Sequence, residues 1–437
     1  MNKFSLILEK KLMPIAFKIG SQRHLQAIRD GIVLITPFVI IGSIFLIIAN
    51  LPIAGYPALM AHIFGPTWQD GLQIAVNATF GLAGILACIG IAYRLAGQYK
   101  IDSLACLAIS LCVYIMLIPI QLMPSATGVA ASLVLPIGYL NSSGIFVGII
   151  VAFIVTEIFR IFVKKNIMIK MPEGVPPAVM KTFAALIPGL FIIFVFWFIR
   201  IILAHTGFHD AFNIVAVIIG KPVSILGGSL IGVIVAVTIA QILWLGGIQG
   251  QALIFGIMAP IWLNFTDQNR LAYIAGQHLP NVITQPFLDL FYSIGGSGVT
   301  FSLVFLMLFR ARSKQLKSIA RLAAAPALFN INEPVIFGLP IILNPIMVIP
   351  FVVTPIVVIT MTYFAMKLGL VAHTVGIMLP WTTPPIISGY LATGGHISGA
   401  VMQIVTIFVA GAIYYPFFKI FDRQKLAEEN SIEKESV

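Results

Sequence analysis

The chain has 437 residues, of which 59% are hydrophobic and only 9% are charged. Soluble proteins carry about 25% charged residues, so this chain cannot cover a water-soluble surface of its length. Its net charge of +11 is collected in clusters beside apolar segments, which is typical of membrane-protein loops and excludes nucleic acid as a partner. We therefore predict an all-α polytopic membrane protein embedded in a lipid bilayer.

The apolar segments predict about ten transmembrane helices plus two re-entrant hairpins. A helix needs about 20 apolar residues to cross the bilayer. The expected spans in chain order are 31–54, 72–94, 103–123, 144–163, 182–204, 225–246, 251–266, 291–309, 345–366 and 398–420. Residues 1–23 precede them and predict an amphipathic helix on the membrane surface. They do not resemble a cleavable signal peptide.

Three basic clusters orient these spans. They lie within residues 3–29, 160–181 and 310–321, each next to an apolar span. With ten spans all three fall on one side, which the positive-inside rule makes the cytoplasm. We therefore predict a multi-pass protein of the cytoplasmic membrane with both termini in the cytoplasm. Residues 422–437 are polar and acidic and are predicted to form a solvated cytoplasmic tail.

Two apolar stretches, 322–344 and 368–397, are interrupted by prolines and polar residues. Proline interrupts a helix, and non-helical backbone at membrane depth persists only where it is buried in protein or lines a wet cavity. In transporters, such interrupted segments point to the binding site. We therefore predict two re-entrant hairpins here, a scaffold and dimerisation domain over 1–205 and a transport domain over 206–421.

Glu333 stands out among the acids because it lies inside an apolar run. A carboxylate at membrane depth is costly, so its presence there indicates a function. Together with Asn330 and Asn332 it equips an irregular turn to bind a polyhydroxylated ligand. The same carboxylate could serve a proton or a sodium ion, and its structural alternative is a helix cap or an interhelical partner.

Two tryptophans are candidates for stacking against sugar rings, whose C–H faces pack on aromatic planes. Trp244 precedes Gln249 and Gln251 at a glycine-broken helix end, and Trp381 lies within the second hairpin. Interface anchoring is the alternative for each, because it is the common role of membrane tryptophans. His278, in a polar connection, is a further candidate for substrate contact.

The sequence predicts no metal site and no bound cofactor. Cys88, Cys106 and Cys112 lie in apolar runs, without the spacing of a metal site or of a disulfide framework. The glycine-rich segment 295–298 follows no predicted strand and leads into a membrane helix. Close helix packing or a bend therefore explains it better than a phosphate-binding loop does.

Five segments resemble a known family, the sugar-specific membrane permease (component IIC) of the phosphoenolpyruvate-dependent phosphotransferase system (PTS). Its lactose/cellobiose/diacetylchitobiose branch is the most similar. The segments are LQAIRDGIVLITPFVIIGSIFLI, MPEGVPPAVMKTFAALIPG, IGGSGVTFSL, FNINEPVIFGLPIILNPI and PWTTPPIISGYLATGG. The resemblance covers essentially the whole chain. It implies a bacterial cytoplasmic-membrane protein with ten helices and two re-entrant hairpins, which dimerises through its N-terminal half.

The resemblance also implies a function, the translocation of a β-linked disaccharide coupled to phosphorylation of its 6-hydroxyl. The phosphoryl group would come from phosphoenolpyruvate through the IIA component and a phosphocysteine on IIB, so the chain would not be a stand-alone enzyme. By this comparison, Glu333 orients or deprotonates the hydroxyl, Asn332 binds the sugar, and Trp244 and Trp381 are the sugar-contacting aromatics. Gln249 stands where members of the family commonly have histidine.

Two alternatives stay open. An ion-coupled secondary sugar transporter would use Glu333 as its proton site. A sugar sensor without transport is suggested by Gln249 alone, because glutamine can donate and accept hydrogen bonds but cannot take up a proton near neutrality.

Overall fold

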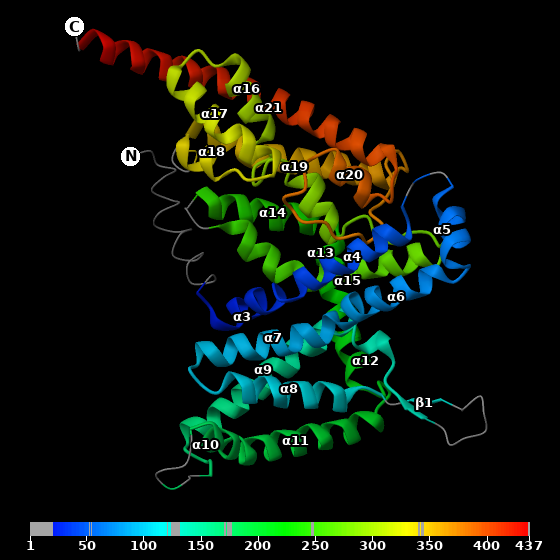
Figure 1. The fold of residues 1–437 in the computed structure, drawn as a ribbon. Coiled ribbons are helices and arrows are strands. Elements are labelled where there is room, and N and C mark those ends of the chain that lie inside the picture. The colour runs from blue at the N-terminus through cyan, green and yellow to red at the C-terminus, as the bar shows by residue number, and fades with distance from the viewer. Residues whose placement is uncertain are drawn as a thin grey trace.

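The computed structural model describes residues 21–435 apart from residues 52, 54, 120, 124–131, 170, 171, 173–176, 246–248, 340 and 342–344. The predicted amphipathic helix over 1–23 lies almost entirely outside the described residues. The described part is a stack of helices whose axes run mostly side by side (Figure 1). An all-α membrane fold is confirmed, with one short β-ribbon in addition.

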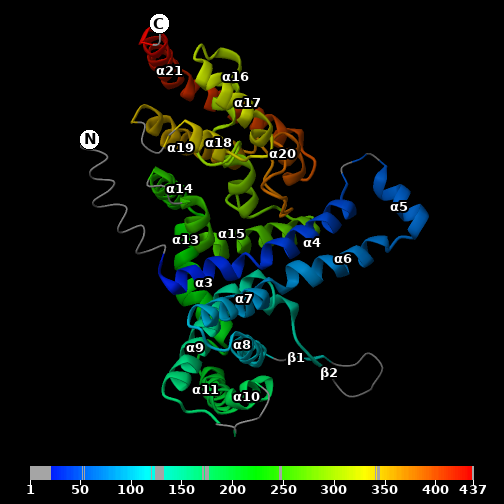
Figure 2. The ribbon, with the colours of Figure 1, turned by 60° about the vertical axis from the view of Figure 1, so that its left-hand side comes forward.

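The first half of the chain supplies the lower and middle layers of the stack (Figures 1 and 2). Its helices are α3 (Arg23–Ile32), α4 (Ile35–Ala49), α5 (Tyr56–Phe64), α6 (Trp68–Thr79), α7 (Ala83–Gln98), α8 (Ser103–Leu117), α9 (Ile145–Lys164), α10 (Pro177–Ala184) and α11 (Leu186–Ala204). Helices α8 to α11 form one end of the stack, and α3 and α9 contact residues 250–274 of the second half.

The second half supplies the rest. Its helices are α12 (Ala211–Val215), α13 (Lys221–Gly228), α14 (Leu230–Leu245), α15 (Gly250–Ile274), α16 (Phe301–Arg310), α17 (Lys314–Leu328), α18 (Glu333–Gly338), α19 (Pro345–Lys367), α20 (Ile387–Ala392) and α21 (Ile397–Glu435). Short 3-10 or π turns cover Phe80–Leu82, Ile137–Tyr139, Ser142–Gly144, Ala216–Gly220 and Phe287–Tyr292. Two large clusters of buried apolar side chains show how the halves join. One cluster contains residues of both halves, and the other contains only residues of the second half.

Seven helical segments among the described residues are long and apolar enough to cross a membrane. They are Arg23–Ala49, Trp68–Gln98, Ser142–Lys164, Thr182–Ala204, Ala211–Gly228, Ile346–Lys367 and Ile397–Ser431. Three shorter apolar helices, α8, α14 and α16, accompany them. The chain is therefore a multi-pass membrane protein, while the predicted number of ten spans is not confirmed.

The predicted span 103–123 is too long. Asp102 caps the start of α8 by accepting hydrogen bonds from the amides of Leu104 and Ala105, each at 3.0 Å. The helix ends at Leu117, and Ile118 takes an extended conformation because Pro119 follows it. Residues Gln121–Met123 then form β1, which pairs antiparallel with β2 (Ser132–Val134).

Three spans predicted in the second half differ from the structure. The span 225–246 is broken at Ser229, which is extended, and an unpredicted apolar helical segment precedes the break. In the span 291–309 a π turn ends at Tyr292 and α16 begins only at Phe301, because the glycines of residues 295–298 turn the chain between them. The span 251–266 is instead a 25-residue helix, because the polar residues at its end continue α15.

The tail predicted over 422–437 is helical as far as Glu435, because it continues α21, a helix of 39 residues. Asp422 accepts hydrogen bonds from the amides of Arg312 and Ser313 at 2.9–3.0 Å. Glu429 accepts one from Ser313 Oγ at 2.6 Å and others from the amides of Lys314 and Gln315. Both carboxylates therefore hold the end of α21 against the start of α17.

Candidate functional site

The turn between α17 and α18 is the centre of the candidate site. Asn330 takes a left-handed conformation with φ 60°, and α18 begins at Glu333 with Pro334 in its first turn. The side chain of Asn330 is 6% exposed and connects three segments. Its Oδ1 accepts a hydrogen bond from the amide of Gly295 at 2.8 Å, and its Nδ2 donates to the carbonyls of Trp381 at 2.7 Å and Thr383 at 3.1 Å.

Asn332 fixes the other side of this turn. Its Nδ2 donates to the carbonyl of Ser297 at 2.7 Å and to Thr300 Oγ1 at 3.3 Å. Gly296 lies so close that an added Cβ would be 2.5 Å from Asn332 Cγ, and its φ is +83°. A residue with a side chain could not take this place. The glycine-rich segment is therefore a tight bend packed on the turn, as its sequence context predicted.

A chain of polar contacts continues from this bend to the start of α15. Ser297 Oγ donates a hydrogen bond to Gln251 Oε1. Gln251 Nε2 donates in turn to Ser293 Oγ at 2.8 Å. Gln249, at the N-cap position of α15, is exposed and makes no capping hydrogen bond with its side chain. Gln249 thus lies two residues before Gln251 of the polar chain, and its exposed side chain is accessible to a ligand.

Glu333 and Trp381 are the two candidate residues that present exposed side chains beside the turn. Glu333 follows Asn332 directly and is exposed. Trp381 is 54% exposed although its own carbonyl is held by Asn330. The buried side chains of Asn330 and Asn332 therefore hold the backbone next to Glu333, a hydrogen-bond acceptor, and the backbone of Trp381, an aromatic plane. This pair of groups suits a polyhydroxylated ring.

Trp244 differs from Trp381 in its surroundings. It is 6% exposed and packs in the apolar cluster of the second half together with Leu303 and Met307. Its indole Nε1 is buried and has no hydrogen-bond partner among the described residues. Trp244 is thus a core residue in this conformation and offers no open face to a ring.

His278 lies in a different part of the molecule. It lines a cavity of about 760 Å³ whose described walls include none of the other five candidate residues. The centroid of its ring lies 5.9 Å from that of His373 in an edge-on arrangement. His373 itself has carbonyls of Leu279 and Met366 at 3.2 Å from its two ring nitrogens, as expected of an interior histidine.

Comparisons with known proteins identify the family to which the chain belongs. Residues 29–355 match the family described as Phosphotransferase system, EIIC. The chain belongs to this family. It is 51% identical to the lichenan permease IIC component of Bacillus subtilis (strain 168), over 99% of this EIIC chain and 97% of the relative. It is 52% identical to the cellobiose-specific EIIC component of Geobacillus stearothermophilus, with the same coverage.

A solved structure is also similar to this EIIC chain. It is the crystal structure of the transporter ChbC, the IIC component from the N,N'-diacetylchitobiose-specific phosphotransferase system. The TM-score is 0.93 at 50% sequence identity, and the match covers 97% of this chain and 99% of the other. The predicted membership in the lactose/cellobiose/diacetylchitobiose branch of the IIC permeases is confirmed.

Sequence reasoning missed three buried polar side chains that hold the segment around Trp381 in this EIIC chain. Asn269 Nδ2 donates to the carbonyl of Thr374 at 2.8 Å. Ser43 Oγ accepts from the amide of Met378 at 2.7 Å. Gln403 satisfies backbone groups on the far side of the segment, among them the amide of Gly389 at 2.9 Å. The only signal in the sequence was that each is polar in or beside an apolar span.

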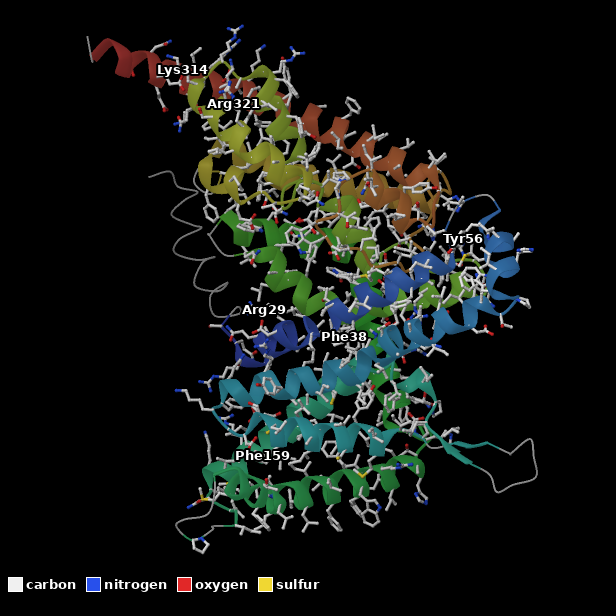
Figure 3. The ribbon with its side chains drawn as sticks, viewed as in Figure 1. Arg29, Phe38, Tyr56, Phe159, Lys314 and Arg321 are labelled. Atoms are coloured by element: carbon white, nitrogen blue, oxygen red, sulfur yellow. The ribbon has the colours of Figure 1, made fainter. Side chains whose placement is uncertain are left out.

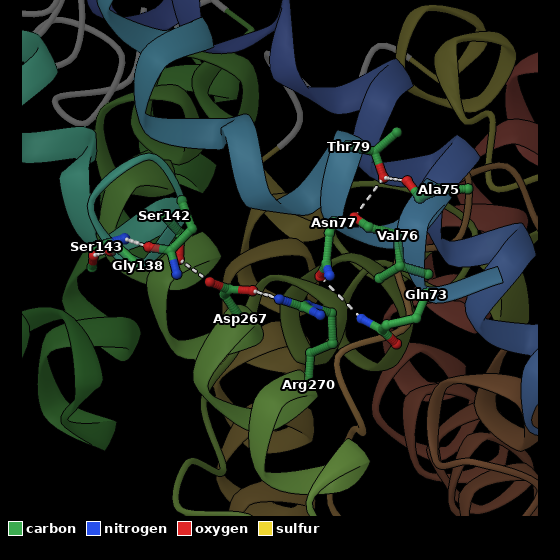
Figure 4. A network of polar contacts seen from close by, with 11 residues as sticks. Gln73, Ala75, Val76, Asn77, Thr79, Gly138, Ser142, Ser143, Asp267 and Arg270 are labelled. Carbon is green, nitrogen blue, oxygen red and sulfur yellow. Dashed lines mark hydrogen bonds and ion pairs between the residues drawn. The ribbon is translucent and has the colours of Figure 1, made fainter. Parts of the chain in front are cut away.

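A buried ion pair near the same segment was missed as well (Figure 4). Asp267 and Arg270 lie one turn apart on α15, and their side chains are almost fully buried. Ser142 Oγ, from the first half of the chain, donates to Asp267 Oδ2 at 2.7 Å. The Arg270 guanidinium also lies over the Phe80 ring, with Cζ 4.9 Å from its centroid. These contacts attach α15 to the first half.

Proposed function

We propose that this EIIC protein carries a β-linked disaccharide across the cytoplasmic membrane and holds it for phosphorylation. The observation that carries the proposal is the exposure of Glu333 and Trp381 beside one turn whose backbone Asn330 and Asn332 fix. Relatives named for cellobiose, lichenan and N,N'-diacetylchitobiose support the choice of sugar class. Cellobiose is therefore the first substrate to test.

The proposed roles follow from the chemistry of each group. Trp381 packs on the C–H face of one sugar ring and Gln249 binds hydroxyls. Asn332 is 4% exposed in this conformation and binds a hydroxyl only after the turn around it opens. Glu333 accepts a hydrogen bond from the hydroxyl that is phosphorylated. Since Gln249 cannot take up a proton near neutrality, the acid–base work falls to Glu333 and to groups of the incoming partner. Trp244 requires a repacked core to contact the sugar, and we place His278 outside this site.

The proposed reaction is a phosphoryl transfer from the IIB phosphocysteine to the 6-hydroxyl of the sugar. The hydroxyl oxygen forms the new P–O bond as the P–S bond breaks, and the cysteine leaves as a thiolate. Glu333 draws the hydroxyl proton as the oxygen attacks. We propose that no metal or cofactor is bound by this chain and that the phosphoryl group comes from phosphoenolpyruvate through IIA and IIB on other polypeptides.

The distribution of basic residues supports the proposed orientation, with both termini in the cytoplasm. Lys314 and Arg321 lie near the end of α21, and Arg29 lies toward the same side of the molecule (Figure 3). Tyr56 lies toward the opposite side (Figure 3). By the positive-inside rule the side with Lys314 and Arg321 is cytoplasmic. This is the side from which IIB would approach, and we propose that two chains dimerise through their N-terminal halves.

Transport into membrane vesicles tests the proposal. Vesicles that contain the protein receive labelled cellobiose, lactose or diacetylchitobiose, with and without phosphoenolpyruvate and the cytosolic components. We expect accumulation of sugar phosphate only when the complete set is present. Uptake of unmodified sugar that a protonophore abolishes would favour the ion-coupled transporter instead. Binding without accumulation under all conditions would favour the sensor.

A further inference from the structure

The segment that leads to Trp381 is held by a residue from the other half of the chain. Residues 374–378 have neither helical nor strand structure and lead into the segment that carries Trp381. Ser43, on α4, accepts a hydrogen bond from the amide of Met378 at 2.7 Å. Its hydroxyl donates at the same time to the carbonyl of Val39, one turn earlier in α4, at 2.9 Å. Ser43 is 0% exposed and Met378 is 4% exposed, so water cannot replace either bond.

The rest of this entering backbone is attached to α15. Asn269 holds the carbonyl of Thr374, and Gly376 packs against Arg270 so closely that an added Cβ would lie 2.5 Å from Arg270 Cβ. Helix α15 is attached to the first half in turn through the hydrogen bond between Asp267 and Ser142. The backbone before Trp381 is thus fixed to the first half directly, by Ser43, and indirectly, through α15.

The backbone at and after Trp381 is fixed differently. Asn330 holds the carbonyls of Trp381 and Thr383, and Gln403 holds the amides of Ile386 and Gly389. Both of these side chains belong to the second half of the chain. Trp381 therefore lies between an attachment to the first half, three residues before it, and an attachment to the second half at its own carbonyl.

We propose that Ser43 is a positioning residue for the sugar site, which sets the orientation of Trp381 from the first half of the chain. This inference rests on the proposed function. A serine suits the role because its hydroxyl is satisfied by its own helix and still offers lone pairs to an incoming amide. Alanine at position 43 would leave the Met378 amide buried and unpaired, so the segment shifts until that amide finds a new acceptor.

Two measurements on the purified full chain in detergent test this inference. Amide hydrogen–deuterium exchange of peptides covering residues 374–383 reports whether Ser43 holds the Met378 amide. Titration with cellobiose reports the affinity of the site. In the Ser43→Ala variant we expect faster exchange in these peptides and affinity that is weaker by about 5- to 50-fold. The Ser43→Thr variant keeps the hydroxyl and should restore protection from exchange and most of the affinity.

A matched control and a double-mutant cycle separate positioning from a general loss of stability. Ser110 is also a buried serine of the first half, but its Oγ has no hydrogen-bond partner among the described residues. Ser110→Ala should therefore change neither readout. Because Ser43 acts through Trp381, the effects of Ser43→Ala and Trp381→Ala on affinity should not add. Additive effects would overturn the proposal.

The remaining outcomes are also decisive. Unchanged exchange in Ser43→Ala would show that Ser43 does not hold the segment, and unchanged affinity despite faster exchange would show that the attachment does not position the site. A wild-type protein that binds no β-linked disaccharide would contradict the proposed function. The exchange measurement needs no sugar, so it would still establish whether the Ser43 attachment exists.

Discussion

Arg270 and Asp267 form an ion pair at 2.7 Å, and their side chains are 2% and 5% exposed. A charge at such depth is strongly destabilising unless an opposite charge lies beside it. Asp267→Asn leaves the guanidinium without a counter-charge and should lower the free energy of unfolding by about 3–5 kcal/mol. Thermal unfolding in detergent measures this loss. The double variant Asp267→Leu, Arg270→Met should be less destabilised than Asp267→Asn, and the opposite order would contradict the pairing.

Removal of the Glu333 charge should separate binding from chemistry. In Glu333→Gln we expect phosphorylation of cellobiose to fall by about 100- to 10,000-fold, because the attacking hydroxyl loses its base, while bound sugar stays detectable. Single-turnover transfer from phosphorylated IIB measures the rate. Glu428→Gln removes one exposed carboxylate from the end of α21 and serves as the control. Full phosphorylation activity in Glu333→Gln would leave Glu333 as a binding or structural residue.

Gln249→His should raise the transfer rate or leave it unchanged.

Trp381→Ala should weaken the binding of cellobiose by about 1–3 kcal/mol through the loss of one stacking surface. The pH dependence of binding should stay unchanged, because tryptophan does not titrate. Isothermal titration at two pH values measures both quantities. Trp197 on α11, which is 47% exposed against 54% for Trp381, gives a matched control for the loss of an exposed indole. Wild-type affinity in Trp381→Ala would indicate an interface anchor.

The end of α21 should detach from the start of α17 in acid. The hydrogen bond from Ser313 Oγ, together with those from the amides of Gln315 and Lys314, holds the pKa of Glu429 below its usual 4.5. Ionised Glu429 therefore stabilises the contact above pH 4.5, and this contribution disappears as the pH falls through the lowered pKa. In the wild type, amide exchange at residues 313–316, corrected for its intrinsic pH dependence, should become faster in acid. In Glu429→Gln it should already be faster at higher pH. Equal protection in the variant and the wild type at neutral pH would contradict this role.

The proposed orientation predicts which positions a membrane-impermeant thiol reagent reaches. In a background without Cys88, Cys106 and Cys112, a cysteine at Lys317 should react only from the cytoplasmic side. A cysteine at His62 on α5 should react only from outside. Both side chains are exposed in the structure. Reaction of the Lys317 position from outside would reverse the topology of the second half.

Continuous apolar runs made part of the fold predictable. The expected span 144–163 matches α9 (Ile145–Lys164) to one residue at each end, and the interrupted segment 322–344 contains the turn at Asn330. Polar runs misled the prediction, because residues 266–270 resemble a loop when their partners are unknown. Those partners lie far along the chain: Ser142 is 125 residues from Asp267, and Thr374 is 105 residues from Asn269.

The candidate site was predictable only where a residue contradicts its local sequence. Glu333 is an acid in an apolar run, and Trp381 lies among prolines, so both attracted attention. Ser43 does not, because a serine in an apolar span has the same appearance in the sequence whether or not its hydroxyl has a partner. Ser43 binds a distant amide, whereas Ser110 Oγ has no hydrogen-bond partner in the described part of the chain. The attachment of Trp381 to the first half is a property of the tertiary structure and has no local signature.

Helix α21 has 39 residues and is therefore about 58 Å long, about twice the thickness of the hydrocarbon layer. Near one end, Gln403 holds the backbone that follows Trp381, and near the other, Asp422 and Glu429 grip the basic loop before α17. Helix α21 thus connects the segment that carries Trp381 to the basic loop before α17, and Pro416 is the position at which this helix can bend. A protein that docks on the basic loop would therefore act on the segment that carries Trp381 through the movement of α21.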